Sequence, residues 1–337
     1  MVGYLNDLID NLGNEYAGVA ENALDSDVNF VDTGSYAFNA LLSGSIYGGL
    51  PGNKVTALAG ESSTGKTFFA LGVAKNFLDM DKEAGVIYFE TEGALTKQIL
   101  EDRDIDTNRF VIVPVTTIQE FRTQAVRILE NHKSVPEPAR KPILFCLDSL
   151  GMLSTEKEIR DALDDKQVRD MTKSQLVKGA FRMLTLKLGQ ANIPLIVTNH
   201  TYDVIGSYIP TKEMGGGSGL KYAASTIIYL SKKKEKDKTE VVGNIIKAKT
   251  AKSRLSRENK DVNIRLYYDE RGLDRYYGLL ELGELGGLWK NVAGRYEMDG
   301  KKVYAKNIYE EPEKYFTEEV MKKLDEIAMK TYSYGTL

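Results

Sequence analysis

Short apolar runs alternate with longer amphipathic stretches through the first two thirds of the chain. The apolar runs end at Gly60, Phe89, Leu147 and Asn199, and polar residues follow each of them. Between the runs, apolar residues recur at helical spacing; these patterns predict helices over 68–78, 118–131 and 170–191, and 110–115 reads as a further strand. Strands that alternate with helices in this way are typical of a mostly parallel sheet covered on both faces.

The pattern changes after residue 220, where three apolar or alternating runs follow one another with few helices between them. These runs, 223–230, 241–248 and 262–268, predict antiparallel strands added to the edge of the sheet. Two helical patterns, 277–286 and 316–332, surround a stretch rich in Gly, Tyr and Lys. We therefore expect an α/β core over 30–275 and a small C-terminal α/β module over 276–337.

The first residues carry apolar side chains at helical spacing, including Tyr4, Leu5 and Leu8. The pattern predicts an amphipathic arm over residues 1–29. From the residues alone, this arm could pack on its own core or on a neighbouring subunit.

Residues 60–67 read Gly-Glu-Ser-Ser-Thr-Gly-Lys-Thr and fit the phosphate-loop pattern G-x-x-x-x-G-K-[ST] at every fixed position. Such a loop turns its backbone N–H groups toward phosphates at a helix N-terminus, where the helix dipole favours anions. Lys66 can reach the β- and γ-phosphates, and the Thr67 hydroxyl can bind Mg²⁺. The sequence therefore predicts a nucleotide-binding protein.

Acidic residues follow two of the predicted strands, and in a parallel sheet the strand ends gather at one edge. Asp148 ends one apolar run and is the expected partner of Thr67 at Mg²⁺. Glu90 and Glu92 follow another run. We expect Glu92 to orient the attacking water, with Glu90 as the alternative.

The polar pair Asn199 and His200 ends a further strand and leads into a loop with aromatic residues, a lysine and a glycine cluster. In this loop Tyr202 and Tyr208 could stack on bases, and Lys212 could meet a phosphate, as in sequence-tolerant binders of single strands. A mobile lid over the nucleotide is the alternative.

Charge and composition narrow the class of protein. The net charge is −3, yet residues 231–260 hold 11 Lys and Arg against 4 Asp and Glu, a local basic surplus suited to a nucleic-acid backbone. The single cysteine, Cys146, lies in an apolar run, and two histidines with one cysteine are too few for a zinc site. Since no apolar run reaches membrane-spanning length and no signal peptide is recognisable, we expect a cytoplasmic protein without membrane contact.

Five segments together resemble the RecA-type strand-exchange recombinases, and within them the UvsX branch of T-even-like bacteriophages. They are Gly-Glu-Ser-Ser-Thr-Gly-Lys-Thr (60–67), Phe-Glu-Thr-Glu-Gly (89–93), Leu-Asp-Ser-Leu-Gly (147–151), Asn-His-Thr-Tyr (199–202) and Met-Gly-Gly-Gly-Ser-Gly (214–219). The resemblance runs from about residue 30 to about residue 285. Asn199-His200 together with the triple glycine is particular to the phage branch.

The resemblance implies that the core over 30–275 is a RecA-like P-loop ATPase domain. It further implies an ATP- and Mg²⁺-dependent recombinase that forms helical filaments on single-stranded DNA, pairs them with homologous duplex DNA and exchanges strands. It implies Glu92 as catalytic glutamate, Asp148 as metal-associated aspartate and His200 as γ-phosphate sensor. Lys252 and Arg254 would reach the phosphates of the neighbouring subunit, with Lys247 and Lys249 as rivals for that role.

The same resemblance implies the remaining contacts. The nucleotide would meet Gly60, Glu61, Ser62, Ser63, Thr64, Gly65, Lys66, Thr67, Asp148 and Ile99, the last where relatives carry an aromatic residue beside the adenine. The polar segment 154–172 and the segment 201–214 would be two DNA-binding loops. DNA contacts are expected from Arg160, Lys166, Arg169, Tyr202, Tyr208, Lys212, Gly215, Gly216 and Gly217.

The resemblance also implies that the arm docks on the adjacent subunit, in the cytoplasm of an infected bacterium. Single-strand-binding and loader proteins are the further partners we expect. Two rival functions remain open: a ring-forming helicase of the same ATPase superfamily, and a mediator whose nucleotide only governs partner binding.

Overall fold

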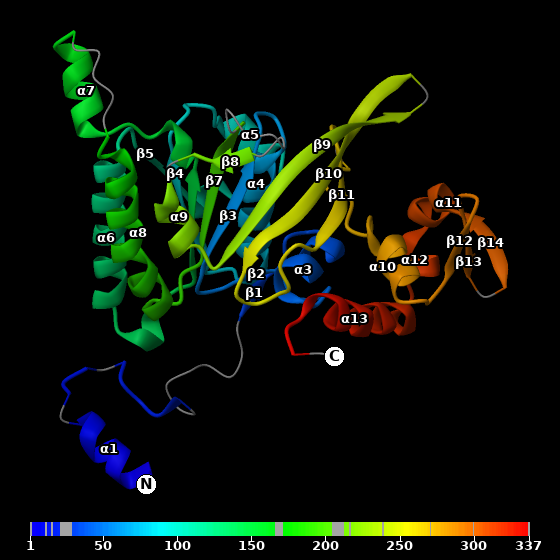
Figure 1. Cartoon of the computed structure of the whole chain (residues 1–337), viewed down its shortest axis with the longest axis horizontal. Helices are drawn as coiled ribbons and strands as arrows, with labels where there is room; N and C mark the ends of the chain where they lie inside the picture. Colours follow the sequence, from blue (N-terminus) through cyan, green and yellow to red (C-terminus); the bar gives the residue numbers. More distant parts are fainter. Residues whose placement is uncertain are drawn as a thin grey trace.

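In the computed structural model, the described residues are 2–10, 12–14, 16–20, 29–165, 171–203, 212–215, 217–237, 239–269, 271–298 and 300–335. Their centre is a nine-stranded sheet with the order β11-β10-β9-β3-β7-β6-β4-β5, in which β8 pairs with β7 (Figure 1). The strands are β3 (Val55–Gly60), β4 (Gly85–Glu90), β5 (Phe110–Pro114), β6 (Ile143–Asp148), β7 (Leu195–Asp203), β8 (Lys212–Met214), β9 (Thr226–Asp237), β10 (Glu240–Ser253) and β11 (Asp261–Tyr267).

The sheet has the mixed character that the sequence predicts. The six strands that lie side by side from β5 through β4, β6, β7 and β3 to β9 run parallel. Beyond β9, β10 and β11 are antiparallel additions. β10 and β9 form a long ribbon that extends past the rest of the sheet (Figure 1). The expected parallel core with antiparallel edge strands is therefore confirmed. The run 223–230 is an exception: it was expected as an antiparallel edge strand, but it begins β9, which pairs parallel with β3 inside the sheet.

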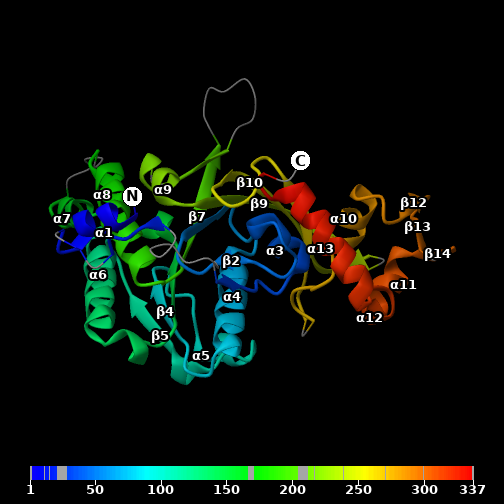
Figure 2. The ribbon, with the colours of Figure 1, turned by 90° about the horizontal axis from the view of Figure 1, so that it is seen from below.

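Helices cover both faces of the sheet, and each face has its own apolar core (Figure 2). On one face, α3 (Tyr36–Ser43) and α4 (Lys66–Met80) pack over side chains such as Tyr88 and Cys146. On the other, α6 (Ile118–Ser134) and α8 (Lys173–Gln190) pack over Phe89 and Phe145. Successive residues of one strand thus enter opposite cores, as the pleat of a strand requires.

Two expectations about loops are wrong. The segment 154–172, expected as a polar loop, contains helix α7 (Glu156–Leu163), which begins at Thr155 with a capping box. The Thr155 hydroxyl accepts from the Glu158 N–H, and the Glu158 carboxylate accepts from the Thr155 N–H. These two hydrogen bonds fix the start of the helix without an apolar stripe. Strand β7 does not end at Asn199 and His200 but continues to Asp203, because 201–203 pair with 212–214 of β8.

The remaining elements lie at the two ends and around the core. Near the start are α1 (Val2–Asp10) and the short pair β1 (Phe30–Val31) and β2 (Leu50–Pro51); α5 (Lys97–Glu101) and α9 (Ser218–Ala223) lie within the core. The C-terminal elements are α10 (Leu279–Leu285), β12 (Lys290–Val292), β13 (Arg295–Met298), β14 (Lys301–Tyr304), α11 (Ala305–Glu310), α12 (Pro312–Tyr315) and α13 (Glu318–Tyr332). Within the described residues, every helix is too short or too polar to cross a lipid bilayer.

The last helix returns to the core. Asp325 of α13 accepts hydrogen bonds from the Ser45 hydroxyl (2.7 Å) and the Ile46 N–H (2.9 Å), just after α3. Ser256 and Ser333 form a β-bridge, and the Tyr334 hydroxyl donates to the Ser253 carbonyl (3.2 Å). The chain after α13 therefore braces the segment that follows β10.

Most of the large apolar side chains of the arm that the structure describes remain exposed. Tyr4, Leu5, Leu8 and Leu12 are 66%, 43%, 51% and 64% exposed. α1 hangs below the core in Figure 1, and the arm touches α6 through Tyr16, whose ring lies 4.7 Å from the Lys133 ammonium. An apolar stripe left in solvent is available to another surface.

Candidate functional site

The phosphate loop joins β3 to α4, as its sequence predicts. Ser63 (φ 58°) and Gly65 (φ 89°) adopt left-handed conformations just before the helix begins. A Cβ on Gly60 would lie 2.7 Å from Thr64 Oγ1 and 2.8 Å from the Leu230 carbonyl, so only glycine fits there. The loop therefore opens onto the N-terminus of a 15-residue helix, a ready site for phosphate.

The side chain of Lys66 curls over this loop. Its ammonium donates to the carbonyls of Gly60 (3.0 Å) and Glu61 (2.8 Å) and is largely buried. Burial lowers the pKa of Lys66, although Asp148 and Glu92 favour its charged form. A desolvated cation held at the loop mouth is well placed to receive the terminal phosphates of a nucleotide.

The two residues expected at Mg²⁺ touch each other. The Thr67 hydroxyl donates to Asp148 Oδ2 at 2.7 Å. Hydroxyl and carboxylate oxygens are hard ligands that suit Mg²⁺, which completes its shell with water and phosphate oxygens. In the part of the chain that the structure describes, no group of three or more His, Cys, Asp or Glu is placed to hold a metal by itself. The donor set therefore fits a cation that arrives with its nucleotide.

Asp148 is held from two further directions. The Tyr88 hydroxyl donates to Oδ2 at 2.6 Å, and the Thr198 hydroxyl forms a very short hydrogen bond with Oδ1. Burial and the Asp148 carboxylate raise the pKa of Tyr88 well above its usual value, so its hydroxyl remains a donor. Neither partner was anticipated from the sequence.

The structure distinguishes the two glutamates. Glu90 accepts from the N–H groups of Glu92, Gly93 and Ala94 (2.8–3.2 Å), which makes it the cap of the turn after β4. Glu92 lies within this turn, but its carboxylate accepts from the Ser149 hydroxyl (2.9 Å) and lies 3.6 Å from His200 Nε2. Lys66, Thr67, Glu92, Asp148 and His200 therefore converge at the edge where the parallel strands end.

A hollow of about 950 Å³ adjoins the phosphate loop. Its wall includes Ser63, Phe68, Arg103 and Tyr267, but not Ile99, which lies half-buried against the core. The Arg103 guanidinium lies 5.1 Å from the centre of the Phe68 ring, and its Nε is buried with no hydrogen-bond partner in the described residues. The hollow thus has an aromatic ring and a guanidinium in its wall beside the phosphate site.

The four cations near the end of β10 differ in their contacts. Lys247 pairs with Asp261 (2.7 Å), and the Lys252 ammonium donates to the carbonyls of Lys221 (2.7 Å) and Tyr222 (3.2 Å) at the end of α9. The side chains of Lys249 and Arg254 are exposed and form no hydrogen bond or ion pair with another described residue. Of the two cations we expected to act in trans, only Arg254 is therefore uncommitted.

The residues expected to contact DNA are partly described. Lys166, Arg169, Tyr208 and Gly216 lie outside the described residues. Arg160 is exposed on α7, Tyr202 is 58% exposed on β7, and Lys212 pairs closely with Glu61 of the phosphate loop.

The described glycines of this region are closely packed. A Cβ on Gly215 would lie 2.9 Å from the Tyr202 ring, and the Gly215 N–H donates to the His200 carbonyl (3.0 Å). Gly217 has φ 71°, and a Cβ there would meet Ser174 at 2.8 Å. The glycine run therefore lets this segment lie directly against β7 and α8.

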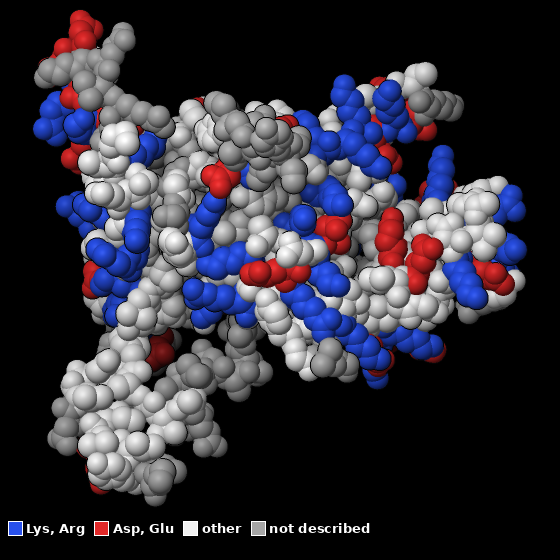
Figure 3. Space-filling model, in the orientation of Figure 1, with Lys and Arg blue, Asp and Glu red and all other residues white. Residues whose placement is uncertain are grey.

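Basic side chains gather over α8, α9 and the β9–β10 ribbon on one face of the molecule (Figure 3). The ribbon itself carries the exposed lysines Lys232, Lys233, Lys234, Lys236, Lys247 and Lys249. Because successive residues of a strand point to opposite faces, Lys232, Lys234 and Lys236 lie on the other side of the ribbon from Lys233, Lys247 and Lys249. The basic surplus of the sequence is thus exposed on both sides of the ribbon.

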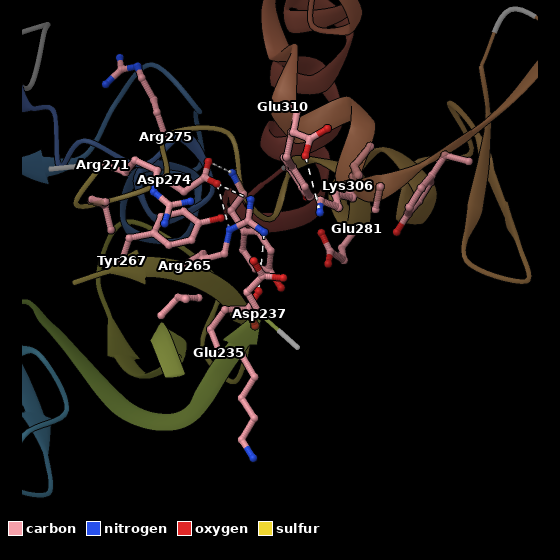
Figure 4. Close-up of a pocket in the computed structure, with 18 residues that line it drawn as sticks. Glu235, Asp237, Arg265, Tyr267, Arg271, Asp274, Arg275, Glu281, Lys306 and Glu310 are labelled. Carbon is pink, nitrogen blue, oxygen red and sulfur yellow. Dashed lines mark hydrogen bonds and ion pairs between the residues drawn. The ribbon is translucent and has the colours of Figure 1, made fainter. Parts of the chain in front are cut away.

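A second hollow, of about 840 Å³, lies between the β9–β11 edge and the C-terminal module (Figure 4). Arg265 in its wall pairs with Asp274 (2.5 Å) and Glu235 (3.8 Å), and the rings of Tyr267, Tyr277 and Tyr309 surround its guanidinium. Arg265 therefore forms a joint between the sheet edge and the elements that follow it, through Asp274, Tyr277 and Tyr309.

Comparisons with known proteins agree with this geometry. The family described as RecA N-terminal domain matches residues 7–274. The chain is 33% identical over 259 residues to the "Recombination and repair protein" of Enterobacteria phage T4. This match spans 77% of the present chain and 64% of the phage protein. It is 25% identical over 281 residues to "Protein RecA" of Paracoccus denitrificans (82% and 74%) and 27% identical over 306 residues to "Protein RecA" of Chloroherpeton thalassium (89% and 81%). The expected RecA-like fold is confirmed, and the chain belongs to the RecA family.

Proposed function

We propose that this chain is an ATP-dependent DNA recombinase that forms helical filaments on single-stranded DNA and exchanges it with homologous duplex DNA. The observation that carries the proposal is the course of β7. This strand brings His200 to 3.6 Å from Glu92 at the phosphate site and runs on, through Tyr202, into the segment expected to bind DNA. One strand therefore belongs to both sites.

The contacts around Gly215 make that connection stiff. The Asn199 amide donates to the Gly215 carbonyl (2.8 Å), and the Gly215 N–H donates back to the His200 carbonyl (3.0 Å). A γ-phosphate beside His200 would bias the position of this ladder, and its removal would release the bias, which is the usual logic of nucleotide switches. DNA affinity would then follow the state of the nucleotide.

The site supports hydrolysis as well as binding. Lys66 would hold the terminal phosphates, and Thr67 with Asp148 would hold Mg²⁺, which supplies charge neutralisation at the phosphates. Glu92, oriented by the Ser149 hydroxyl at 2.9 Å, would orient the attacking water. The capping contacts of Glu90 leave it unsuited to that role.

The base would occupy the hollow beside the phosphate loop. Phe68 and Arg103 line its wall, and Arg103 Nη1 donates to the carbonyl of Ile99, which replaces an expected aromatic residue, at 3.2 Å. A purine ring can stack on the Phe68–Arg103 pair and accept a hydrogen bond from Arg103.

Filament formation would rest on the arm and on the cations after β10. The exposed apolar residues of α1, unburied in their own subunit, suit docking on the adjacent subunit. The exposed Arg254 could reach a neighbour's phosphates, whereas Lys252 is committed to α9. The proposed division is an arm over 1–29, the ATPase core over 30–275 and a C-terminal module over 276–337.

The expected partners are single-stranded and homologous duplex DNA, further copies of this chain, and single-strand-binding and loader proteins of an infected bacterial cell. The basic face over α8, α9 and the β9–β10 ribbon gives a DNA backbone an electrostatic footprint (Figure 3).

The test is ATP turnover with and without single-stranded DNA, together with electron microscopy of the complex with a non-hydrolysable ATP analogue. We expect DNA to stimulate turnover, Lys66→Ala to abolish it, and open helices to form on the DNA. Closed hexameric rings that unwind forked duplexes would favour the helicase. DNA-independent or negligible turnover with normal nucleotide binding would favour the mediator.

A further inference from the structure

The carboxylate of Asp148 is gripped by the two strands that flank it in the sheet. β6, which carries Asp148, lies between β4 and β7. From β4, the Tyr88 hydroxyl donates to Oδ2 at 2.6 Å; from β7, the Thr198 hydroxyl donates to Oδ1. Asp148 itself is 8% exposed. The plane of its carboxylate is therefore set by side chains from both sides.

The third donor to this carboxylate differs from the other two. Thr67 Oγ1 lies 2.7 Å from Asp148 Oδ2, but its hydroxyl oxygen is itself an expected Mg²⁺ ligand. When Thr67 turns its oxygen to a cation, this contact with Asp148 changes, whereas the contacts from Tyr88 and Thr198 can persist. These two hydroxyls are the constant part of the arrangement.

Tyr88 is held rigidly enough to serve as a fixed donor. Its side chain is fully buried, and it lies opposite Cys146 in the β4–β6 ladder, two residues before Asp148. The long phenol spans that offset, and its ring packs against Phe110 of the next strand with centroids 5.4 Å apart. A fully buried hydroxyl is removed from bulk solvent, so its hydrogen bond to Asp148 is its main stabilising contact.

We propose that Tyr88 is a positioning residue of the metal site, whose hydroxyl orients the Asp148 carboxylate and thereby strengthens the binding of the divalent cation that accompanies the nucleotide. The inference rests on the proposed Mg²⁺ site. Groups that orient a metal-binding carboxylate through a hydrogen bond commonly change metal affinity about 10- to 100-fold when removed. We expect the lower end of that range here, because Thr198 continues to hold Oδ1.

The experiment compares the wild-type protein with Tyr88→Phe, which removes one oxygen and keeps the ring. Mn²⁺ is titrated into each protein with saturating ADP, and free Mn²⁺ is read from its electron paramagnetic resonance signal. We expect roughly 10-fold weaker Mn²⁺ binding in the variant, an unchanged ADP affinity in EDTA, and a higher Mg²⁺ requirement for turnover. The matched control is Tyr309→Phe in α11, whose hydroxyl accepts from the Gly278 N–H; it should bind Mn²⁺ like the wild type.

The outcomes are distinguishable. If the wild-type protein with ADP binds no Mn²⁺ beyond ADP alone, the proposed metal site fails. If it binds Mn²⁺ and folded Tyr88→Phe binds it equally well, only the role of Tyr88 fails. An equal loss of metal-free ADP binding would show a general structural effect and would also overturn the role.

Should Tyr88→Phe not fold, 3-fluorotyrosine at position 88 keeps the hydroxyl and provides a reporter. Its ¹⁹F resonance should shift when Mg²⁺ is added to the ADP complex, because the carboxylate that it contacts changes partners. A resonance unchanged by Mg²⁺ would overturn the inference.

Discussion

Replacing Arg254 by alanine should separate catalysis from stability in this protein. The Arg254 side chain is exposed and forms no hydrogen bond or ion pair with another described residue, and only its backbone N–H is engaged, with the Ser225 carbonyl at 3.0 Å. Removal of such a side chain changes the free energy of unfolding by no more than about 0.5 kcal/mol. The isolated subunit should therefore melt and bind nucleotide as the wild type does.

The effect on turnover should be far larger. A cation delivered to the phosphates by a neighbouring subunit contributes on the order of 10³-fold or more to ATP hydrolysis, equivalent to about 4 kcal/mol of transition-state stabilisation. Lys252→Ala should show the opposite balance. It removes two hydrogen bonds from an ammonium to the end of α9 and should lower the free energy of unfolding by about 1–2 kcal/mol.

A mixing assay decides whether Arg254 acts across an interface. Arg254→Ala and Lys66→Ala subunits should each be inactive on single-stranded DNA. In an equal mixture, about a quarter of head-to-tail interfaces combine an intact phosphate loop with an intact arginine. DNA-stimulated turnover should therefore reappear in the mixture, at a corresponding fraction of the wild-type rate.

The reasoning is refuted if the mixture stays inactive while both variants still coat DNA together. It is also refuted if Arg254→Ala weakens nucleotide binding in the isolated subunit, because the residue would then act on its own nucleotide. Lys249→Ala is the matched comparison, since that cation is equally exposed on β10.

Three further expectations concern other parts of the site and fold. Glu92→Gln should reduce ATP turnover at least about 10²-fold and leave nucleotide binding intact. Glu90→Gln should chiefly lower the melting temperature, because it weakens the cap on three N–H groups. If the two roles are exchanged, ATPase assays and thermal melts will show the opposite pattern. Arg265→Ala should cost about 3 kcal/mol of unfolding free energy in chemical denaturation, since it leaves half-buried acids unpaired, and an unchanged midpoint would contradict the joint. Burial raises the pKa of Asp32, but its hydrogen bonds and the Arg275 charge outweigh burial and leave that pKa below 3.8. The stability that this carboxylate contributes is therefore present above 3.8 and is lost as the pH falls through the lowered pKa. In thermal melts at pH 2–5, Asp32→Asn should lose less stability on acidification than the wild type does.

Motifs with fixed spacing were predictable because local geometry determines them. The phosphate loop needs small residues and a helix start within eight positions, and residues 60–67 supply them. The location of Asp148 could be predicted because the carboxyl ends of parallel strands all lie along one edge of the sheet. The preference for Glu92 over Glu90 remains a prediction, which the capping role of Glu90 supports.

Contacts between distant segments could not be read from the chain. The partners of Asp148 come from three elements, and nothing in the sequence marks Tyr88 or Thr198 as more than core residues. Helix α7 was missed because a capping box, rather than an apolar stripe, defines its start; Thr155 and Glu158 at that spacing were the available signal. The hydrogen bonds from Lys252 to the end of α9 depend on a register shift in β10 between Thr250 and Lys252. No local sequence pattern predicts this shift.

If the proposed nucleotide and DNA sites are correct, the distribution of side-chain contacts makes them respond as one unit. Lys212, at the start of β8, pairs with Glu61 of the phosphate loop, and Lys232 of β9 donates to the Ser63 carbonyl (2.6 Å). Each is an exposed contact and is individually weak. The stiff part is the ladder from His200 to Gly215, where glycine alone permits the close approach to Tyr202. A phosphate drawn to Lys66 would reorganise the loop that those lysines touch, and a DNA strand drawn to the β7–β8 segment would do so from the other side. By linkage, each ligand must then strengthen or weaken the binding of the other by the same factor.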